Sequence, residues 1–287
     1  MNIGYIISAY KYGAQVERLI RRLDGEGASF FLHIDKRAGG LREELSHRLR
    51  DVTDLHFLEQ HRCVWGGFGH VAATLKGIDA ICERRVPCEY VVLLTGQDYP
   101  IRPLQHIHEV LKHAEGRSFM EYFPLPTTMW DGGGFDRVLR WHLRVLGRHF
   151  VFPRRHTSRF ARRFPAGFRP FGGSSYWCLA RDVVDYVHAF FAANPSFVRF
   201  FRHVDVPDEV IFQTILLNSD LRDRIVNDDL RYIRWPDPAS GSPAILTTSD
   251  FSDLARSPKL FGRKFDATVD ENILDLIDAR ILGGKAP

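Results

Sequence analysis

The chain has 287 residues, of which 45% are hydrophobic and 26% charged, and its formal net charge is +4. A chain of this length and composition can bury a full two- or three-layer core as one large domain, and its mildly basic charge says little about partners. Its four cysteines are too sparse for a disulfide scaffold and lack zinc-binding spacing, and no apolar run reaches the ~18 residues that span a bilayer.

The first 123 residues alternate short apolar runs with helical periodicities. Runs typical of buried parallel strands lie at 3–8, 30–34, 55–58, 90–94 and 118–122. Between them, apolar residues recur at helical spacing over 16–23, 41–49, 71–82 and 104–111. This order predicts a mainly parallel sheet with helices on both faces.

The regular alternation stops near residue 123. Residues 124–173 are rich in Gly, Pro, Arg and aromatic residues, which predicts irregular backbone and, at this length, either a functional segment or a short helix that cannot be placed. Order returns with a strand near 174–179, helices over 182–193 and from 207, a short strand at 231–233, and helices after 248 and over 271–282.

Acidic residues follow two of the predicted strands, at the edge where open α/β sheets bind ligands. Asp35 and Asp98 can therefore point into one cleft, although Asp after a strand is also a common turn residue. Glu209 lies in Val206-Pro207-Asp208-Glu209, which begins a helix. Acids are favoured in a first helical turn by the helix dipole, so spacing alone favours a structural role for Glu209.

A basic segment near the C-terminus, Phe261-Gly262-Arg263-Lys264-Phe265-Asp266, sets two adjacent cations between aromatic residues. Arginine offers a planar fork to phosphate and lysine a compact charge. The alternative is a solvated turn with buried Phe neighbours.

Together these segments resemble glycosyltransferase family 14, the core-2/I-branching β-1,6-N-acetylglucosaminyltransferases and peptide O-xylosyltransferases. Each matching segment is short, but their order and spacing make the resemblance specific from about residue 6 to 270. The segments are His33-Ile34-Asp35-Lys36, Trp65-Gly66-Gly67, Leu93 to Arg102, Gly173 to Arg181, Val206 to Ser219, Arg231 to Trp235, and Phe261 to Asp266.

The resemblance implies an α/β, GT-A-like (Rossmann-like) nucleotide-sugar-binding fold with a mainly parallel central sheet and, here, an irregular Arg-rich insertion. We expect a single domain over residues 1–287. Within it, 1–123 would be the nucleotide-binding half, 124–173 an Arg- and aromatic-rich insertion, and 174–287 the acceptor and catalytic half.

The resemblance also implies inverting transfer of a sugar from a UDP-sugar, with no divalent metal and no other cofactor. Most GT-A enzymes hold the donor diphosphate through a metal on an Asp-x-Asp motif, and this sequence contains no such tripeptide. Fixed cations must then stabilise the charge that develops on UDP. Lys264 matches the family lysine that contacts the diphosphate, and Arg263 is the second candidate. A further family arginine near 242–246 has no obvious match.

One positioned carboxylate suffices for inversion, because the acceptor attacks in line from the opposite face. The resemblance assigns this base to Glu209, which reverses the choice made from spacing. It places Asp35 near the uridine, and Asp98 near the donor sugar or in a structural hydrogen bond. On the acceptor side it implies Trp235, with Glu121 and Trp177 as further candidates. An aromatic face can pack on a sugar, while core packing is the alternative for both tryptophans.

The family includes enzymes for two sugars, so we expect N-acetylglucosamine, with xylose as the alternative. The product would be a β-linkage to a hydroxyl of a glycan or glycolipid acceptor. A catalytically inactive glycan- or nucleotide-binding module of the same fold is a further alternative.

Ten arginines and no Lys, Asp or Glu lie in Arg137–Arg169, interleaved with aromatic residues. Arg140, Arg144 and Arg148 recur every four residues, as in a helical stripe. This density suits an anionic partner, whether a membrane surface, an acidic polysaccharide or a lipid-diphosphate-linked glycan; a solvated loop is the alternative. We expect neutralisation of Arg154, Arg155, Arg162 and Arg163 to weaken such binding. Nucleic acid is not expected, because that reading explains none of the other motifs.

The apolar run over 3–9 is too short for a signal-peptide core and has no positive flank before it. We therefore expect a cytoplasmic protein that can lie at the inner face of a membrane as a peripheral protein.

Overall fold

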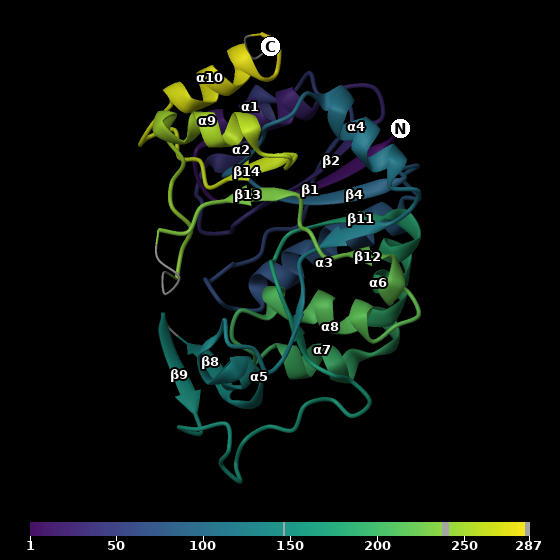
Figure 1. The fold of residues 1–287 in the computed structure, drawn as a ribbon, viewed down its shortest axis with the longest axis vertical. Helices are drawn as coiled ribbons and strands as arrows, with labels where there is room; N and C mark the ends of the chain where they lie inside the picture. Colours follow the sequence, from purple (N-terminus) through teal and green to yellow (C-terminus); the bar gives the residue numbers. More distant parts are fainter. Residues whose placement is uncertain (146, 237–240, 285–287) are drawn as a thin grey trace.

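A seven-stranded sheet with the order β12-β6-β11-β4-β1-β2-β3 forms the centre of the molecule (Figure 1). The computed structural model describes residues 1–145, 147–236 and 241–284. β11 runs antiparallel to its neighbours β4 and β6, and the other pairings are parallel. The strands are β1 (Ile3–Ala9), β2 (Ala28–Ile34), β3 (Leu55–Phe57), β4 (Tyr90–Thr95), β6 (Ser118–Met120), β11 (Trp177–Ala180) and β12 (Ile225–Val226).

The central strands are apolar because both of their faces are covered. Every residue of β1 except Ser8, and every residue of β4 except Thr95, is buried. Such continuous apolar runs are typical of parallel strands packed between two helical layers. The mainly parallel α/β sheet and the GT-A-like fold expected from the sequence are confirmed, and all five strands expected in the first 123 residues are present.

Helices cover both faces of the sheet: in Figure 1, α1, α2 and α10 lie on one side, and α3, α6 and α8 on the other. α1 shows why these segments are helical, since its buried apolar residues Val16, Leu19, Ile20 and Leu23 form a single stripe. The helices are α1 (Gly13–Leu23), α2 (Leu41–Arg48), α3 (Gly69–Glu83), α4 (Leu104–His113), α6 (Arg181–Ala193), α7 (Pro195–Phe201), α8 (Ile211–Leu217), α9 (Phe251–Arg256) and α10 (Asn272–Arg280).

A second, three-stranded sheet lies beside the first and carries the basic segment. It consists of β5 (Asp98–Pro100), β13 (Arg231–Ile233) and β14 (Phe261–Arg263), in the order β13-β14-β5. Phe261 and Phe265 are fully buried. The solvated turn considered for this segment is therefore wrong, because its first half is a strand that is anchored by core aromatic rings.

The Arg-rich insertion contains a β-hairpin, so the predicted helical stripe is wrong. Arg144 and Arg148 lie on paired antiparallel strands, where Arg144 faces His149 and Val145 faces Arg148. Alternating apolar and polar residues favour strands here, and Gly147 takes the positive φ of 76° that a tight hairpin turn requires. The elements of the insertion are β7 (Phe123–Pro124), η1 (Asp131–Gly134), α5 (Phe135–Leu139), β8 (Trp141–Val145), β9 (Arg148–Phe152) and β10 (Phe171–Gly172).

The four cysteines are free thiols, as expected. Among the described residues, no helix combines the length and the apolar character needed to cross a membrane.

Candidate active site

The candidate active site lies at the carboxyl ends of the central parallel strands. β1 pairs with β2 on one side and with β4 on the other, so the course of the chain through the sheet reverses between β1 and β4. Open α/β sheets bind ligands beyond the strand ends at such a reversal. Lys11 follows β1, Asp35 follows β2 and Asp98 follows β4, so this edge gathers two acids that the sequence singled out and one lysine that it did not.

Two buried glutamines hold the basic segment against this edge. Gln15 Nε2 donates to the carbonyl oxygens of Gly96, over 2.8 Å, and Phe265, over 3.2 Å. Gln97 Nε2 donates to the same Phe265 oxygen over 3.1 Å, and the Phe265 amide donates back to the Gln97 carbonyl over 2.9 Å. The chain after β14 is therefore fixed beside the ends of β1 and β4, and Lys264 lies in that fixed stretch.

Lys264 lies in a cluster of positive charge. Its side chain is partly buried, and burial together with the charges of Lys11 and Arg263 lowers the pKa of its ammonium group. Lys11 Nζ pairs with Asp266 at 3.2 Å, whereas Lys264 has no ion-pair partner in the part of the chain that the structure describes. A bound polyanion would offset the repulsion between these cations. The cluster therefore suits a ligand such as a diphosphate.

Arg263 and Asp98 form a buried brace beneath this cluster. Asp98 is fully buried, and its Oδ2 accepts hydrogen bonds from the backbone amide and the hydroxyl of Thr95, both over 2.6 Å. Arg263 Nη1 lies 3.3 Å from the same oxygen, and its guanidinium lies 4.2 Å from the centre of the Tyr176 ring. Of the two roles expected for Asp98, the structure thus supports the structural hydrogen bond. Arg263 is held by Asp98, and its contact with a donor stays a prediction.

Asp35 is almost completely buried and accepts hydrogen bonds on both carboxylate oxygens. Arg37 donates through its amide and Nε to Oδ1, over 2.8 and 3.1 Å, and through Nη2 to Oδ2 over 2.7 Å. The Cys63 amide donates to Oδ2 over 3.1 Å. Although burial opposes ionisation, these bonds lower the pKa of Asp35 to about 2. Any contact with a uridine would therefore be made by a carboxylate that Arg37 already orients.

Glu209 lies in a short 3-10 turn, η2 (Pro207–Glu209), that precedes α8. Neighbouring backbone holds this turn on two sides: the Val206 amide donates to the Gly66 carbonyl over 2.9 Å, and the Gly173 amide donates to the Glu209 carbonyl over 3.0 Å. Val206 itself takes a left-handed conformation with φ 47°. The backbone at Glu209 is therefore fixed by segments from distant parts of the sequence.

Glycine is required at both of these backbone contacts. A Cβ on Gly66 would lie 2.5 Å from the Arg144 guanidinium, and its φ of 68° disfavours any side chain. A Cβ on Gly173 would lie 1.9 Å from the carbonyl oxygen of Glu121. The Trp65-Gly66-Gly67 and Gly173 to Arg181 segments thus matter here through close backbone approach.

The Glu209 carboxylate pairs with the Arg137 guanidinium, and its pKa is raised toward neutrality. Arg137 Nη1 donates to Glu209 Oε2 over 2.6 Å, and both side chains are 28% exposed. The Arg137 guanidinium also lies 3.8 Å from the Trp130 ring centre. Burial and the neighbouring Asp208 charge raise the pKa of Glu209 to about 7, against the opposing effect of Arg137. A carboxylate with this pKa is suited to general-base catalysis at neutral pH.

Asp208 lies between the Glu209 turn and the Arg263–Asp98 brace. Its Oδ2 accepts a hydrogen bond from the Ser175 hydroxyl over 2.8 Å. Burial raises the pKa of Tyr176, and the charges of Arg263, Asp98 and Asp208 all lie close enough to act on that hydroxyl. Asp208, the neighbour of Glu209 in the sequence, and the Arg263–Asp98 brace therefore all lie near the Tyr176 hydroxyl.

The acceptor-side candidates differ in exposure. Trp177 is fully buried on β11, 5.8 Å from the Phe212 ring, so its assignment to the acceptor site is corrected to core packing. Trp235, which follows β13, is 51% exposed, and its indole is available to a sugar. Glu121, next to Gly173, is an exposed residue overall, but desolvation of its carboxyl group and the Asp229 charge raise the pKa of that group. For Trp235 and Glu121 the acceptor role stays a prediction.

Metal-ligating atoms gather at one place among the described residues: His142, His149 and Asp205 each offer an atom within 4.8 Å of the others. These residues lie on β8, on β9 and in the loop before η2. Asp205 is already paired with the Arg144 guanidinium. At the donor edge, the oxygens of Asp98 are engaged by Thr95 and Arg263 and are enclosed by protein, which does not fit a metal ligand.

The mainly parallel sheet, with acids and cations at the carboxyl ends of its strands, is typical of α/β proteins that bind ligands at this edge. The chain belongs to the Core-2/I-Branching enzyme family, which matches residues 3–255. It is similar to xylosyltransferase 2 of Canis lupus familiaris, at 25% identity over 95% of this chain and 33% of that protein, and of Homo sapiens, at 24% over the same shares. It is also similar to xylosyltransferase 1 of Rattus norvegicus, at 25% over 94% of this chain and 34% of that protein.

The chain spans about a third of the length of these relatives. Among solved structures, a 4-diphosphocytidyl-2C-methyl-D-erythritol synthase from Anaerococcus prevotii aligns with a TM-score of 0.32 and 11% identity, over 70% of this chain and 83% of that chain. That likeness is too slight to argue from.

Sequence reasoning missed three cations of the site: Lys11, Arg37 and Arg137. Lys11 and Arg37 could have been found, because each lies three residues beyond the end of a predicted strand. Arg137 could not be found in this way, because it is one of ten arginines in the insertion and only the fold brings it to Glu209.

Proposed function

We propose that this protein is an inverting glycosyltransferase that transfers a sugar from a UDP-sugar to an acceptor hydroxyl without a divalent metal. The observation that carries the proposal is the Glu209 carboxylate, which is partly exposed, is held by Arg137 and has a pKa of about 7. Family membership supports glycosyl transfer, and the charge of the basic segment supports a diphosphate donor.

In the proposed reaction, the acceptor oxygen attacks C1 of the donor sugar from the face opposite UDP. The new C1–O bond forms as the bond between C1 and the phosphate oxygen breaks, which gives a β-linkage from an α-linked donor. Glu209 accepts the proton of the acceptor hydroxyl. In this proposal, Lys264 and Lys11 stabilise the negative charge that develops on UDP, and their clustering supports that role.

Two features support metal independence. The sequence lacks an Asp-x-Asp tripeptide, and the acid at the corresponding strand end, Asp98, is bound to Thr95 and Arg263. The lysine cluster supplies positive charge that a divalent ion supplies in other enzymes.

The transferred sugar is either N-acetylglucosamine or xylose. The resemblance in the sequence favoured N-acetylglucosamine, whereas the relatives described above are named xylosyltransferases. Because of these names, UDP-xylose is the first donor to test. Both donors fit the chemistry of Glu209 and Lys264 equally.

A donor screen that measures UDP release, with and without EDTA, tests the proposal. We expect turnover with one of the two donors, retention of turnover in EDTA, and a β-linked product by NMR. Glu209→Gln should abolish transfer while UDP affinity stays nearly unchanged, and the exposed Glu83→Gln serves as the matched control. A strict metal requirement would contradict the role given to the lysines, and equal loss of transfer and UDP binding in Glu209→Gln would make Glu209 a structural residue.

A further inference from the structure

The β8–β9 hairpin has an outer face that is apolar and exposed. In the hairpin register, Leu143 pairs with Phe150 and Trp141 with Phe152, and directly opposed side chains lie on the same face. Leu143, Val145, Phe150 and Phe152 are 41%, 54%, 52% and 56% exposed. We call these four side chains the outer face; Trp141 lies at its edge.

The inner face of the same hairpin holds it to the body of the protein. His142 is buried, its amide donates to the His203 carbonyl over 3.1 Å, and its Nδ1 lies 3.1 Å from His149 Nε2. Arg144 pairs with Asp205. Because these contacts fix the orientation of both strands, the outer face is a defined part of the surface.

Phe160 extends the apolar surface beyond the hairpin. Its ring is 55% exposed and lies 6.1 Å from the Phe152 ring. Half of the exposed large hydrophobic side chains identified in the described residues come from positions 141–160. An exposed apolar patch of this kind marks a surface that another phase or molecule covers.

The ten arginines of the insertion divide into two groups. Four are used inside the protein: Arg137, Arg140, Arg144 and Arg162. Arg162 donates to the His203 carbonyl over 2.9 Å and to the Phe200 carbonyl, and its guanidinium lies 3.8 Å from the Phe200 ring centre. The expectation that Arg162 takes part in binding an anionic partner is therefore corrected. Six are exposed: Arg148, Arg154, Arg155, Arg159, Arg163 and Arg169.

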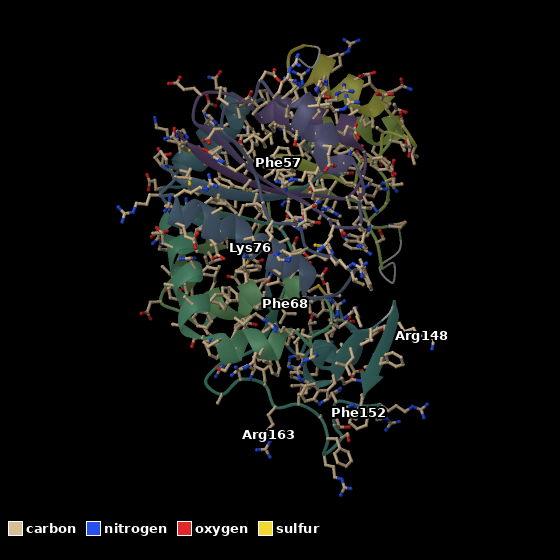
Figure 2. All side chains as sticks on the ribbon, turned by 180° about the vertical axis from the view of Figure 1, so that it is seen from behind. Phe57, Phe68, Lys76, Arg148, Phe152 and Arg163 are labelled. Atoms are coloured by element: carbon tan, nitrogen blue, oxygen red, sulfur yellow. The ribbon has the colours of Figure 1, made fainter. Side chains whose placement is uncertain are left out.

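The exposed arginines border the apolar patch. Arg148 lies beside Val145 in the hairpin register, and Arg159 stacks on Phe160 with its guanidinium 4.7 Å from the ring centre. Figure 2 shows Arg148, Phe152 and Arg163 pointing away from the body at the end of the molecule that the insertion forms. Positive charge around exposed aromatic and aliphatic side chains is the pattern of proteins that bind anionic bilayers.

We propose that the outer face and Phe160 dock on an anionic lipid bilayer, with the six exposed arginines bound to lipid phosphates. A second copy of the chain fits less well, because residues 137–169 contain ten arginines and no acid, so two such surfaces repel each other. A soluble acidic polymer would use the arginines but would leave the apolar side chains in water.

Docking would bring the bilayer close to the candidate base. The Asp205 amide donates to the Arg137 carbonyl over 3.0 Å, and Arg137 in turn binds Glu209, so the hairpin and the base share one network. If Glu209 acts as proposed above, the acceptor hydroxyl belongs to a lipid-linked molecule at the membrane surface. Docking itself does not depend on that function.

Vesicle flotation of the 287-residue chain tests the proposal directly. The probes are phosphatidylcholine vesicles with and without phosphatidylglycerol, at low and high salt. We expect binding only to the anionic vesicles, with an affinity that falls as salt rises. Neutralising Arg154 and Arg155 to Gln should weaken binding about thirtyfold, from about 1 kcal/mol for each arginine near the surface. Phe150→Ser with Phe152→Ser should weaken it about tenfold or more.

Matched controls separate docking from general effects. Arg50→Gln with Arg222→Gln removes two exposed arginines elsewhere, and Val269→Ser removes an exposed apolar side chain elsewhere. These variants should float like the unmodified chain, and circular dichroism should show all variants folded. The proposal is overturned by equal binding to neutral vesicles or by equal loss in the controls. It is also overturned if light scattering shows a dimer that Phe150→Ser dissociates, or if a soluble acidic polysaccharide binds and vesicles do not. None of these readouts requires glycosyl transfer.

Discussion

The Arg137–Glu209 ion pair gives a quantitative prediction for the pH dependence of transfer. Arg137 favours the ionised carboxylate, while burial and Asp208 favour the protonated one, and the balance gives Glu209 a pKa of about 7. A hydrogen bond to a charged group contributes about 1.5–3 kcal/mol net, and about 1.4 kcal/mol corresponds to one pKa unit. Both side chains are 28% exposed, so water reduces the effect and we take the lower end.

Arg137→Gln should therefore raise the pKa of Glu209 by about one unit. The base works only when ionised, so the acidic limb of kcat/KM should move from near pH 7 to about pH 8. Arg137→Lys retains the charge and should keep the limb close to its original position. Asp208→Asn removes a charge that raises the pKa and should move the limb in the opposite direction.

The assay is UDP release measured across the pH range with the preferred donor. Arg50→Gln, which removes an exposed arginine outside the insertion, is the control and should leave the profile unchanged. If the limb of Arg137→Gln stays in place or moves to lower pH, the carboxylate that titrates in the profile is not Glu209. In that case the reasoning from this ion pair is wrong.

Two further predictions concern the lysine cluster and the tryptophans. Lys264→Ala should weaken UDP affinity, measured by calorimetry, about tenfold or more. Lys11→Ala should cause a smaller loss, because the Lys11 ammonium already pairs with Asp266. Unchanged affinity in both variants would show that the lysine cluster does not bind the donor. Trp177→Ala should lower the free energy of unfolding by about 3–5 kcal/mol in denaturant, because it leaves a cavity at a fully buried site. Trp235→Ala, at an exposed site, should leave stability unchanged and raise the KM for the acceptor. The opposite pattern would exchange the roles of the two tryptophans.

The fold could be predicted from the sequence where the local pattern of apolar residues is enough to identify a helix or a strand. The apolar runs of β1 and β4 and the stripe of Val16, Leu19, Ile20 and Leu23 required no tertiary information. β5 and β14 were missed, because each has only three residues and is formed by pairing between distant parts of the chain, β14 with both β5 and β13. The spacing of Arg140, Arg144 and Arg148 indicated a helix, but cross-strand pairing around Gly147 decided the structure instead.

The candidate site could be predicted only in part, because some of its contacts join residues that are far apart in the sequence. Residues at strand ends, such as Asp35 and Asp98, could be found, since the edge of a parallel sheet collects them. Their partners could not, because an ion pair between residues 137 and 209 depends on the path of an irregular insertion. The burial of Trp177 was likewise hidden, because a strand of four residues shows no clear alternation.

β11 is antiparallel to its neighbours in the central sheet, so its beginning, and not its end, lies at the edge where a ligand would bind. β11 starts where its neighbours β4 and β6 finish, so the residues just ahead of it, Ser175 and Tyr176, arrive at that edge without any intervening helix. There the Ser175 hydroxyl donates to Asp208, and the Tyr176 ring lies against Arg263, which pairs with Asp98 from the first half of the chain. The reversed strand thus links residues from both halves of the chain at the ligand edge, through the pairing of β11 with β4 and the ion pair between Arg263 and Asp98.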